Sequence, residues 1–300
     1  MPKLNSIEAI QQALQKQNYL TDRNLATTLL LALKMPRPVF LEGEAGVGKT
    51  EVAKVLAKIL KTDLLRLQCY EGLDVHNAVY EWNYARQMLH IRLLEAAGRR
   101  EEQDILKDIF GAEFLIQRPL LQAIDPARKK AAVLLIDELD RADEEFEAFL
   151  LELLSDFQIT IPEIGTIKTQ KPPVVIITSN RTREIHDALK RRCLYFWIDY
   201  PPPAKEYQII MAKVPKLADK LAREIVLFVQ ELRTQDLYKL PGVAETLDWS
   251  QALLSLSEKE LTSELVDATL GTVLKYQDDL ARVKGQLSAK IISELKTKSF

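Results

Sequence analysis

A glycine-rich stretch carries the clearest chemical signal in this sequence. Its residues are Gly43, Glu44, Ala45, Gly46, Val47, Gly48, Lys49 and Thr50. They fit the pattern G-x-x-x-x-G-K-[ST], in which backbone N–H groups surround phosphate oxygens and the following helix adds the positive end of its dipole. In this pattern Lys49 reaches the β- and γ-phosphates, and the Thr50 hydroxyl binds Mg²⁺. The spacing predicts a loop for nucleotide phosphates; the alternative is a glycine-rich turn in which Lys49 is only exposed.

Two acids follow a strongly apolar run farther along the chain. Asp137 and Glu138 come directly after residues 134–136. An aspartate at the carboxyl end of such a strand could hold Mg²⁺, usually through water. A carboxylate beside it can orient and deprotonate the attacking water, so Glu138 favours hydrolysis over transfer to a second substrate. The alternative is that both acids cap the helix that follows.

Further along the chain, polar and basic side chains stand at the ends of another predicted strand and of a short predicted helix. Asn180 lies after the apolar run 174–177, where ligands of open α/β sheets gather, and could contact the γ-phosphate or the water. It could also be a plain turn residue. Arg191 and Arg192 end a short predicted helix. They could place positive charge on the transition state of a neighbouring chain, or form a solvated helix end.

One sheet has to bring these side chains together, and most of them directly follow a predicted strand. The expected strands are 39–42, 64–67, 131–136, 174–177 and 194–198, and the expected helices are 7–34 with a break at 21–22, 50–61, 85–97, 144–156 and 184–192. A hairpin is predicted for 157–168, and a charged turn for 99–102. Strands that alternate with helices predict a three-layer α/β unit with a mainly parallel, five-stranded sheet.

A second unit is predicted after the prolines 201–203. Residues beyond 205 show helical periodicity only, which indicates an all-helical domain of about four helices. The expected division is therefore a nucleotide-binding domain over 1–201 and a small helical domain over 202–300.

Composition narrows the class of protein. The 300 residues are 47% hydrophobic and 28% charged with a net charge of −2, which disfavours disorder, collagen and coiled coil and gives no broad attraction to nucleic acid. Cys69 and Cys193 match no metal or redox spacing. Neither a signal core nor an apolar run of about 18 residues is present, so a cytoplasmic protein is expected. The basic pairs 99–100 and 129–130 are interpreted as solvated turns.

The order of these motifs resembles an AAA+ ATPase. In that family the loop 43–50 is Walker A, Asp137 and Glu138 are Walker B, Asn180 is sensor 1, and Arg191 or Arg192 is the arginine finger. Arg192 is preferred as the finger because an Arg-Cys pair at this helix end resembles clamp-loader relatives. The stretches 67–74, 80–84 and 245–249 are similar to the MoxR-type branch, whose members are encoded beside von Willebrand A proteins.

The resemblance implies a function and partners. It implies an Mg²⁺-dependent ATPase that assembles with itself into a ring, expected to be a hexamer, and remodels or matures a protein client such as a von Willebrand A protein. Residues 74–86 would include an insertion and, with the hairpin, would face the centre of the ring. The alternatives are a nucleic-acid motor or loader and a nucleotide-dependent scaffold with little turnover. The chain departs from many relatives in having no sensor 2 arginine within 243–246, and Arg223 and Arg233 lie earlier.

Overall fold

The computed structural model describes residues 4–96 and 109–295, so the charged turn predicted at 99–102 lies outside the described residues. The chain divides into two compact units. Unit 1 consists of Met1–Ile10, Asn24–Glu42 and Val52–Phe196, and unit 2 consists of Gln11–Arg23, Gly43–Glu51 and Trp197–Phe300. Within the described ranges, no helix is both long enough and apolar enough to cross a membrane.

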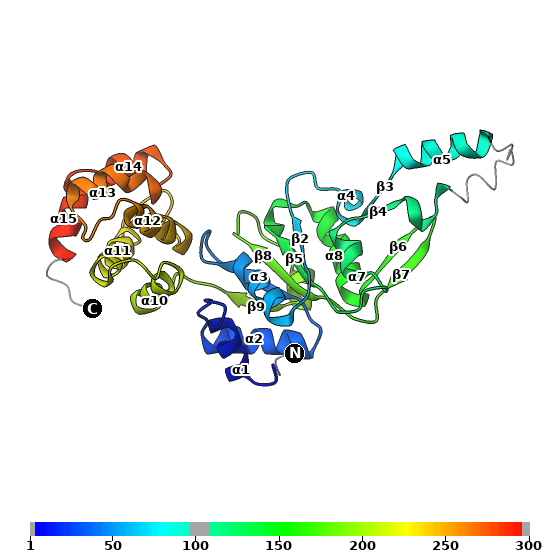
Figure 1. The fold of residues 1–300 in the computed structure, drawn as a ribbon, viewed down its shortest axis with the longest axis horizontal. Helices are drawn as coiled ribbons and strands as arrows, with labels where there is room; N and C mark the ends of the chain where they lie inside the picture. Colours follow the sequence, from blue (N-terminus) through cyan, green and yellow to red (C-terminus); the bar gives the residue numbers. More distant parts are fainter. Residues whose placement is uncertain (1–3, 97–108, 296–300) are drawn as a thin grey trace. The chain divides into compact units, whose positions relative to one another are not determined.

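The centre of unit 1 is a five-stranded parallel sheet with the strand order β2-β5-β8-β1-β9 (Figure 1). The strands are β1 (Val39–Glu42), β2 (Leu64–Gln68), β5 (Val133–Asp137), β8 (Val174–Ser179) and β9 (Leu194–Trp197). Every residue of β1 and β5 is buried, as expected for apolar strands covered on both faces. The predicted strands and the predicted sheet are therefore confirmed.

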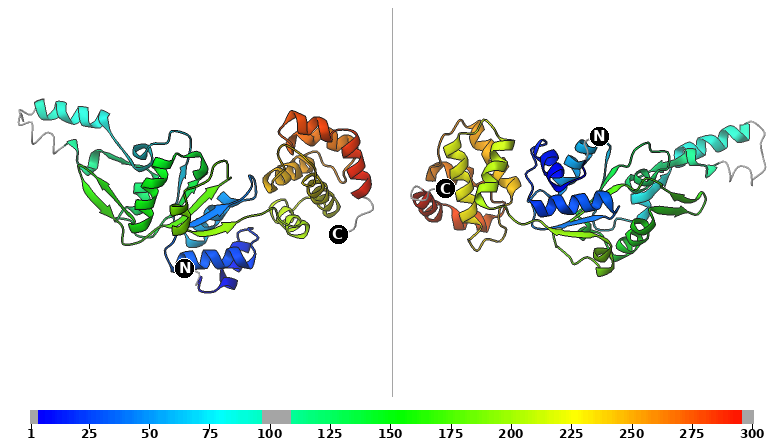
Figure 2. Two further views of the ribbon diagram at one scale, coloured as in Figure 1. Left: turned by 180° about the vertical axis from the view of Figure 1, so that it is seen from behind. Right: turned by 90° about the horizontal axis from the view of Figure 1, so that it is seen from below.

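Helices flank both faces of this sheet (Figures 1 and 2). One face packs its apolar side chains against α7 (Pro119–Ile124) and α8 (Glu144–Asp156) in a single core. On the other side lie α2 (Arg23–Lys34) and α3 (Lys49–Leu60), and α1 (Ile7–Gln15) precedes them. The break between two short helices at 21–22 is therefore confirmed, as is the helix 144–156.

The helix that ends at Arg192 begins later than the sequence suggested. Helix α9 spans Asp187–Arg192 rather than 184–192, because the side chain of His186 accepts a hydrogen bond from the Ala188 N–H and ends the extended segment there. A histidine is not among the usual N-cap residues, which explains why the pattern missed it.

Between β2 and β5 the chain leaves the sheet. It forms α4 (Val75–Val79), β3 (Tyr80–Trp82), α5 (Tyr84–Ala96) and β4 (Leu115–Gln117), and β3 pairs antiparallel with β4. These two strands have three residues each, too few to show an alternating pattern, and the sequence did not predict them. The predicted hairpin is confirmed as β6 (Gln158–Ile161) paired with β7 (Gly165–Lys168). It extends from the same end of unit 1 as α5 in every view (Figures 1 and 2).

Unit 2 has a helical core of its own. The described helices are α10 (Pro203–Lys213), α11 (Asp219–Leu232), α12 (Val243–Ser255), α13 (Ser263–Thr269), α14 (Gln277–Val283) and α15 (Gln286–Leu295). The Trp249 ring is fully buried against Phe228, with centroids 5.4 Å apart, and its indole N–H bonds Thr269 Oγ1 at 2.9 Å. The all-helical character is as predicted, but the expected number of about four helices was too low because α13 and α14 span only seven residues each.

Candidate nucleotide-binding site

The glycine-rich loop joins a strand directly to a helix. It starts at the residue after β1 and ends in the first turn of α3. Lys49 is buried, and its ammonium group donates to the carbonyl oxygens of Gly43 at 2.7 Å and Glu44 at 2.6 Å. The loop thus closes around the one cation that the motif supplies.

Two positions of this loop accept only glycine. Gly43 has φ +154°, and a Cβ there would lie 2.1 Å from the carbonyl oxygen of Ile198. Gly46 has φ +76°, and its Cβ would lie 3.2 Å from the Cα of Gly242. At both points a side chain would collide with neighbouring backbone, so glycine is needed for the loop to adopt this conformation. A loop of this kind, with no side chains at these positions, fits a phosphate cradle built from main-chain N–H groups.

The first turn of α12 lies against the loop within unit 2. The Ala244 N–H donates to the carbonyl oxygen of Gly46 at 3.0 Å, and the Glu245 carboxylate caps the helix by accepting from the Gly242 N–H at 2.9 Å. The sequence offered no sensor 2 arginine at this turn. The structure has a backbone contact there, and the charged side chain at this turn is the acid Glu245 rather than an arginine.

The two arginines that precede α12 have other partners. Arg233 is buried and pairs with the fully buried carboxylate of Glu206, through Nη1–Oε2 at 2.7 Å and Nη2–Oε1 at 2.8 Å. Arg223 is exposed on α11 and pairs with Asp219, Nε to Oδ2, at 2.9 Å. Both pairs lie inside the helical region.

Asp137 ends β5 with its carboxylate buried among three donors. Oδ1 accepts from Thr178 Oγ1 at 2.7 Å, and Oδ2 accepts from Arg66 Nη2 at 2.6 Å and Nε at 3.0 Å. The side chain of Asp137 is 3% exposed, whereas that of Arg66 is 50% exposed. A buried carboxylate thus faces a cation that reaches it from solvent.

Glu138 follows Asp137 and has a left-handed backbone conformation, with φ 55° and ψ 52°. Its N–H donates to Thr178 Oγ1 at 2.9 Å, so one hydroxyl fixes both acids of the pair. Its carboxylate Oε2 accepts from Gln68 Nε2 at 3.1 Å and lies 3.3 Å from Arg141 Nε. The helix α8 is capped by Asp143 instead, whose Oδ1 accepts from the Phe146 N–H.

Asn180 follows β8 at the same edge of the sheet. Its backbone N–H donates to Asp140 Oδ2 at 3.2 Å, and Thr182 donates to the same oxygen from both its N–H and its hydroxyl. Buried Asp140 therefore holds the turn that presents Asn180. Because β5 and β8 are neighbouring parallel strands, Asn180 and Asp137 lie at the same edge of the sheet, where the strands end.

Arg191 and Arg192 end α9 at the surface. Their backbone carbonyls accept from Arg37, from Nη2 at 2.8 Å and from Nε at 3.2 Å respectively. In the described part of the chain, neither guanidinium group has a hydrogen-bond or ion-pair partner. Both are therefore available to another molecule.

Sequence reasoning missed the residues that hold the acids in place. Arg66 lies inside the predicted strand 64–67, Gln68 and Thr178 directly follow predicted strands, and Asp140 lies two residues after Glu138. A charged Arg66 in an otherwise apolar run was the available signal. Its partner is on another strand, which the sequence alone did not reveal.

A parallel sheet with a glycine-rich phosphate loop after β1 and paired acids after β5 defines a P-loop nucleoside-triphosphate-binding protein. The family comparison gives the same class. The model for the AAA domain, dynein-related subfamily, matches residues 38–193, just over half of the chain, and the chain belongs to this family. Its members generally bind nucleotides, typically with Mg²⁺, and hydrolyse ATP.

Relatives of the whole chain have low identity. An uncharacterised protein of Staphylococcus epidermidis is 24% identical over 264 residues, which cover 85% of this chain and 90% of that protein. An uncharacterised protein of Staphylococcus aureus is 23% identical over 248 residues, covering 80% and 84%. Among solved structures, the Holliday junction branch migration motor RuvB of Thermotoga maritima aligns with 16% identity and a TM-score of 0.46, over 89% of this chain and 71% of that chain.

Proposed function

We propose that this protein is an Mg²⁺-dependent ATPase that works as a self-assembled ring and remodels or matures a protein client. The observation that supports ATPase activity is the order β5-β8-β1 of neighbouring strands in the sheet. Because these strands are parallel, their carboxyl ends share one edge. The loop that leaves β1 and the acids that end β5 therefore belong to the same edge, where α/β proteins bind ligands.

Each site residue then has a role that its chemistry suits. Lys49 and the backbone of residues 43–50 bind the phosphates, and Thr50 with Asp137 supplies the oxygen ligands that Mg²⁺ prefers. The metal, when bound, neutralises charge on the phosphates. Glu138 orients and deprotonates water, and Asn180 contacts the γ-phosphate or that water.

The arginine finger extends the proposal to more than one chain. The exposed guanidinium groups of Arg191 and Arg192 lack partners within the described ranges, which supports a role at the site of a neighbouring chain. Arg192 is the preferred finger. The proposed assembly is a hexamer, with a nucleotide-binding domain over 1–201 and a helical lid domain over 202–300.

The client and the branch rest on the resemblance to MoxR-type proteins. A von Willebrand A protein is the proposed client, and the cytoplasm is the proposed location. The segment 74–86 forms α4, β3 and the start of α5, and extends from the sheet beside the hairpin β6–β7. Both segments are proposed to face the centre of the ring, where a client would pass.

The nucleotide site is tested by replacing Lys49 with alanine. Removing its charge is expected to weaken ATP binding at least about 100-fold, since charge-assisted hydrogen bonds contribute about 1.5–3 kcal/mol each. Isothermal titration calorimetry with Mg²⁺ and ATP measures this change. Lys58→Ala, an exposed position on the same helix, is the matched control and should bind normally. Equal affinities for the wild type and the Lys49 variant would contradict the site.

The client is tested with a trapped state. A Glu138→Gln variant that binds ATP and does not hydrolyse it should retain a purified von Willebrand A protein on a column in ATP and release it in ADP. The double variant Lys49→Ala/Glu138→Gln should retain nothing. Retention that is independent of nucleotide would contradict an ATP-driven action on this client.

A further inference from the structure

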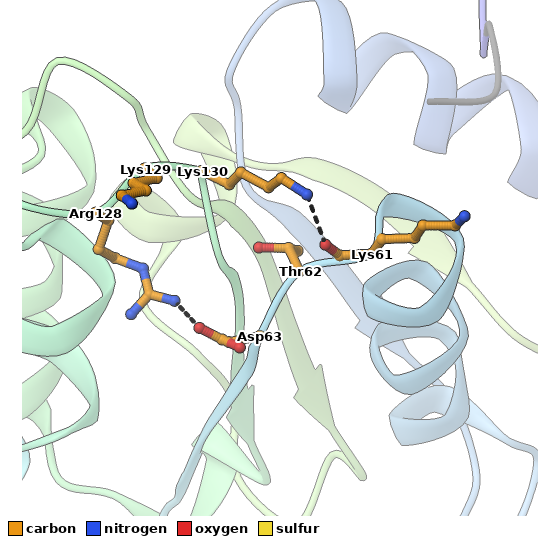
Figure 3. Close-up of a pocket in the computed structure, with 6 residues that line it drawn as sticks. All are labelled: Lys61, Thr62, Asp63, Arg128, Lys129 and Lys130. Atoms are coloured by element: carbon orange, nitrogen blue, oxygen red, sulfur yellow. Dashed lines mark hydrogen bonds and ion pairs between the residues drawn. The ribbon is translucent and has the colours of Figure 1, made fainter.

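A pocket of about 340 Å³ lies in unit 1, at the end of the sheet opposite Asp137 (Figure 3). It is lined by Lys61, Thr62, Asp63, Arg128, Lys129 and Lys130. These residues precede β2 and β5, and the Val133 N–H donates to the Asp63 carbonyl at 3.0 Å where the two strands begin. Because the strands are parallel, the pocket is at their amino ends and Asp137 is at the carboxyl end. A ligand of this pocket is therefore distinct from the nucleotide.

The charges in the pocket are unbalanced. Four cations line it, together with the single carboxylate of Asp63, which pairs with Arg128 (Figure 3). Within the ranges that the structure describes, Lys61, Lys129 and Lys130 have no carboxylate partner. Lys129 and Lys130 thus add two positive charges that no carboxylate balances, and an anion would offset them. The Lys61 side chain points away from both (Figure 3).

Hydrogen bonds to backbone carbonyls order part of this pocket. Lys130 Nζ donates to the Lys61 carbonyl at 3.3 Å (Figure 3). A further cation, Lys171, donates to the carbonyls of Arg128 at 3.4 Å and Lys129 at 3.2 Å. Arg128 itself is 20% exposed, and its Nε is buried without an acceptor among the described residues. The site is therefore partly ordered by the fold and differs from a set of freely moving surface lysines.

We propose that this pocket binds a carboxylate-rich segment of a protein partner. Acidic side chains would pair with the lysines, and the backbone N–H groups of the same segment would donate to the exposed Asp63 carboxylate. A nucleic-acid backbone fits less well, because it needs a longer track of cations and Asp63 would repel its phosphates. Binding here does not depend on the proposed nucleotide site.

The test uses a fluorescein-labelled peptide with six glutamates separated by glycines, titrated with the full chain at low salt. Fluorescence anisotropy should show saturable binding that weakens as salt is added. The double variant Lys129→Ala/Lys130→Ala should bind at least about fivefold more weakly, the effect of losing two partly exposed ion pairs. Both lysines are exposed, and an unchanged melting temperature verifies folding.

The control double variant, Lys16→Ala/Lys259→Ala, removes the same charge from two other exposed lysines and should bind as the wild type does. A peptide with glutamine in place of glutamate should not bind. The proposal is overturned if the wild type does not bind the acidic peptide, if the two double variants lose affinity equally, or if the glutamine peptide binds as well. Tighter binding of single-stranded DNA at the same salt would also overturn it and assign the pocket to nucleic acid. Lys49→Ala should bind the peptide normally. Loss of peptide binding in that variant would show that the peptide binds at the nucleotide loop instead, and would overturn the proposal.

Discussion

Replacing Arg66 with alanine is expected to strengthen metal binding at Asp137. In the structure both Nε and Nη2 of Arg66 bond the Asp137 Oδ2, at 3.0 and 2.6 Å. Thr178 occupies Oδ1 at 2.7 Å. If Asp137 holds Mg²⁺ as proposed, the metal and the guanidinium compete for the same buried carboxylate.

The size of the effect follows from the exposure of the pair. Hydrogen bonds to a charged group contribute about 1.5–3 kcal/mol when well made. Arg66 is half exposed, so solvent screening lowers its net contribution. A value of about 1.5 kcal/mol is reasonable, and it corresponds to roughly tenfold tighter metal binding in the variant. The metal-free protein should lose a similar amount of unfolding free energy, because the buried Asp137 carboxylate loses both hydrogen bonds from Arg66.

Electron paramagnetic resonance measures the affinity for Mn²⁺ in the presence of a non-hydrolysable ATP analogue at saturation, and it does not depend on turnover. Arg66→Lys keeps the charge but loses the two-nitrogen geometry, so its affinity should lie between those of the wild type and Arg66→Ala. Arg223→Ala breaks a comparable exposed pair with Asp219 and serves as the control. An unchanged or weaker Mn²⁺ affinity in Arg66→Ala would refute the competition between Arg66 and the metal.

Three further predictions concern the acid, the finger and the thiols. Glu138→Gln should bind ATP and hydrolyse it at least about 100-fold more slowly in a steady-state phosphate assay, and normal turnover would mean that another group activates the water. Arg192→Ala should bind ATP and lose about 1,000-fold in turnover, and a mixture with Lys49→Ala should partly recover activity; an inactive mixture of proven mixed oligomers would exclude an in-trans role. Burial raises the pKa of Cys69 and of Cys193 to about 12, so neither native thiol should react with a disulfide reagent at pH 8. Above pH 9 the unfolded thiols lose protons that the folded protein retains, so the unfolding free energy should fall by up to about 1.4 kcal/mol per pH unit and thiol, measurable by urea titration.

Local patterns in the sequence determined the main architecture. Apolar runs of four to six residues next to turn residues predicted the five sheet strands. The signal is strongest for β1 and β5, which are buried throughout, because strands buried on both faces must be apolar. The glycine-rich loop was predictable because its spacing follows from backbone geometry within eight consecutive residues. The helix 144–156 was predictable because it has the acidic first turn and the apolar face that its environment requires.

Short elements escaped prediction for a related reason. Strands β3 and β4 pair with each other across more than thirty residues of chain, and three residues alone carry no period. The helices α13 and α14 are similarly short, so their turns merged into one helical pattern. Such elements are stabilised by contacts outside their own sequence window.

Only the tertiary structure decided which charges meet. Arg66 and Asp137 lie on neighbouring strands, and their pairing depends on the register of β2 and β5. The basic pair 129–130, interpreted from sequence as a solvated turn, is exposed as expected and also lines a pocket, because the residue after α3 brings the Lys61 carbonyl beside Lys130. The start of α12 meets Gly46 although almost two hundred residues separate them. Sequence patterns record the preferences of neighbouring residues, whereas electrostatic interactions depend on distance in space, and the packing of the chain sets that distance.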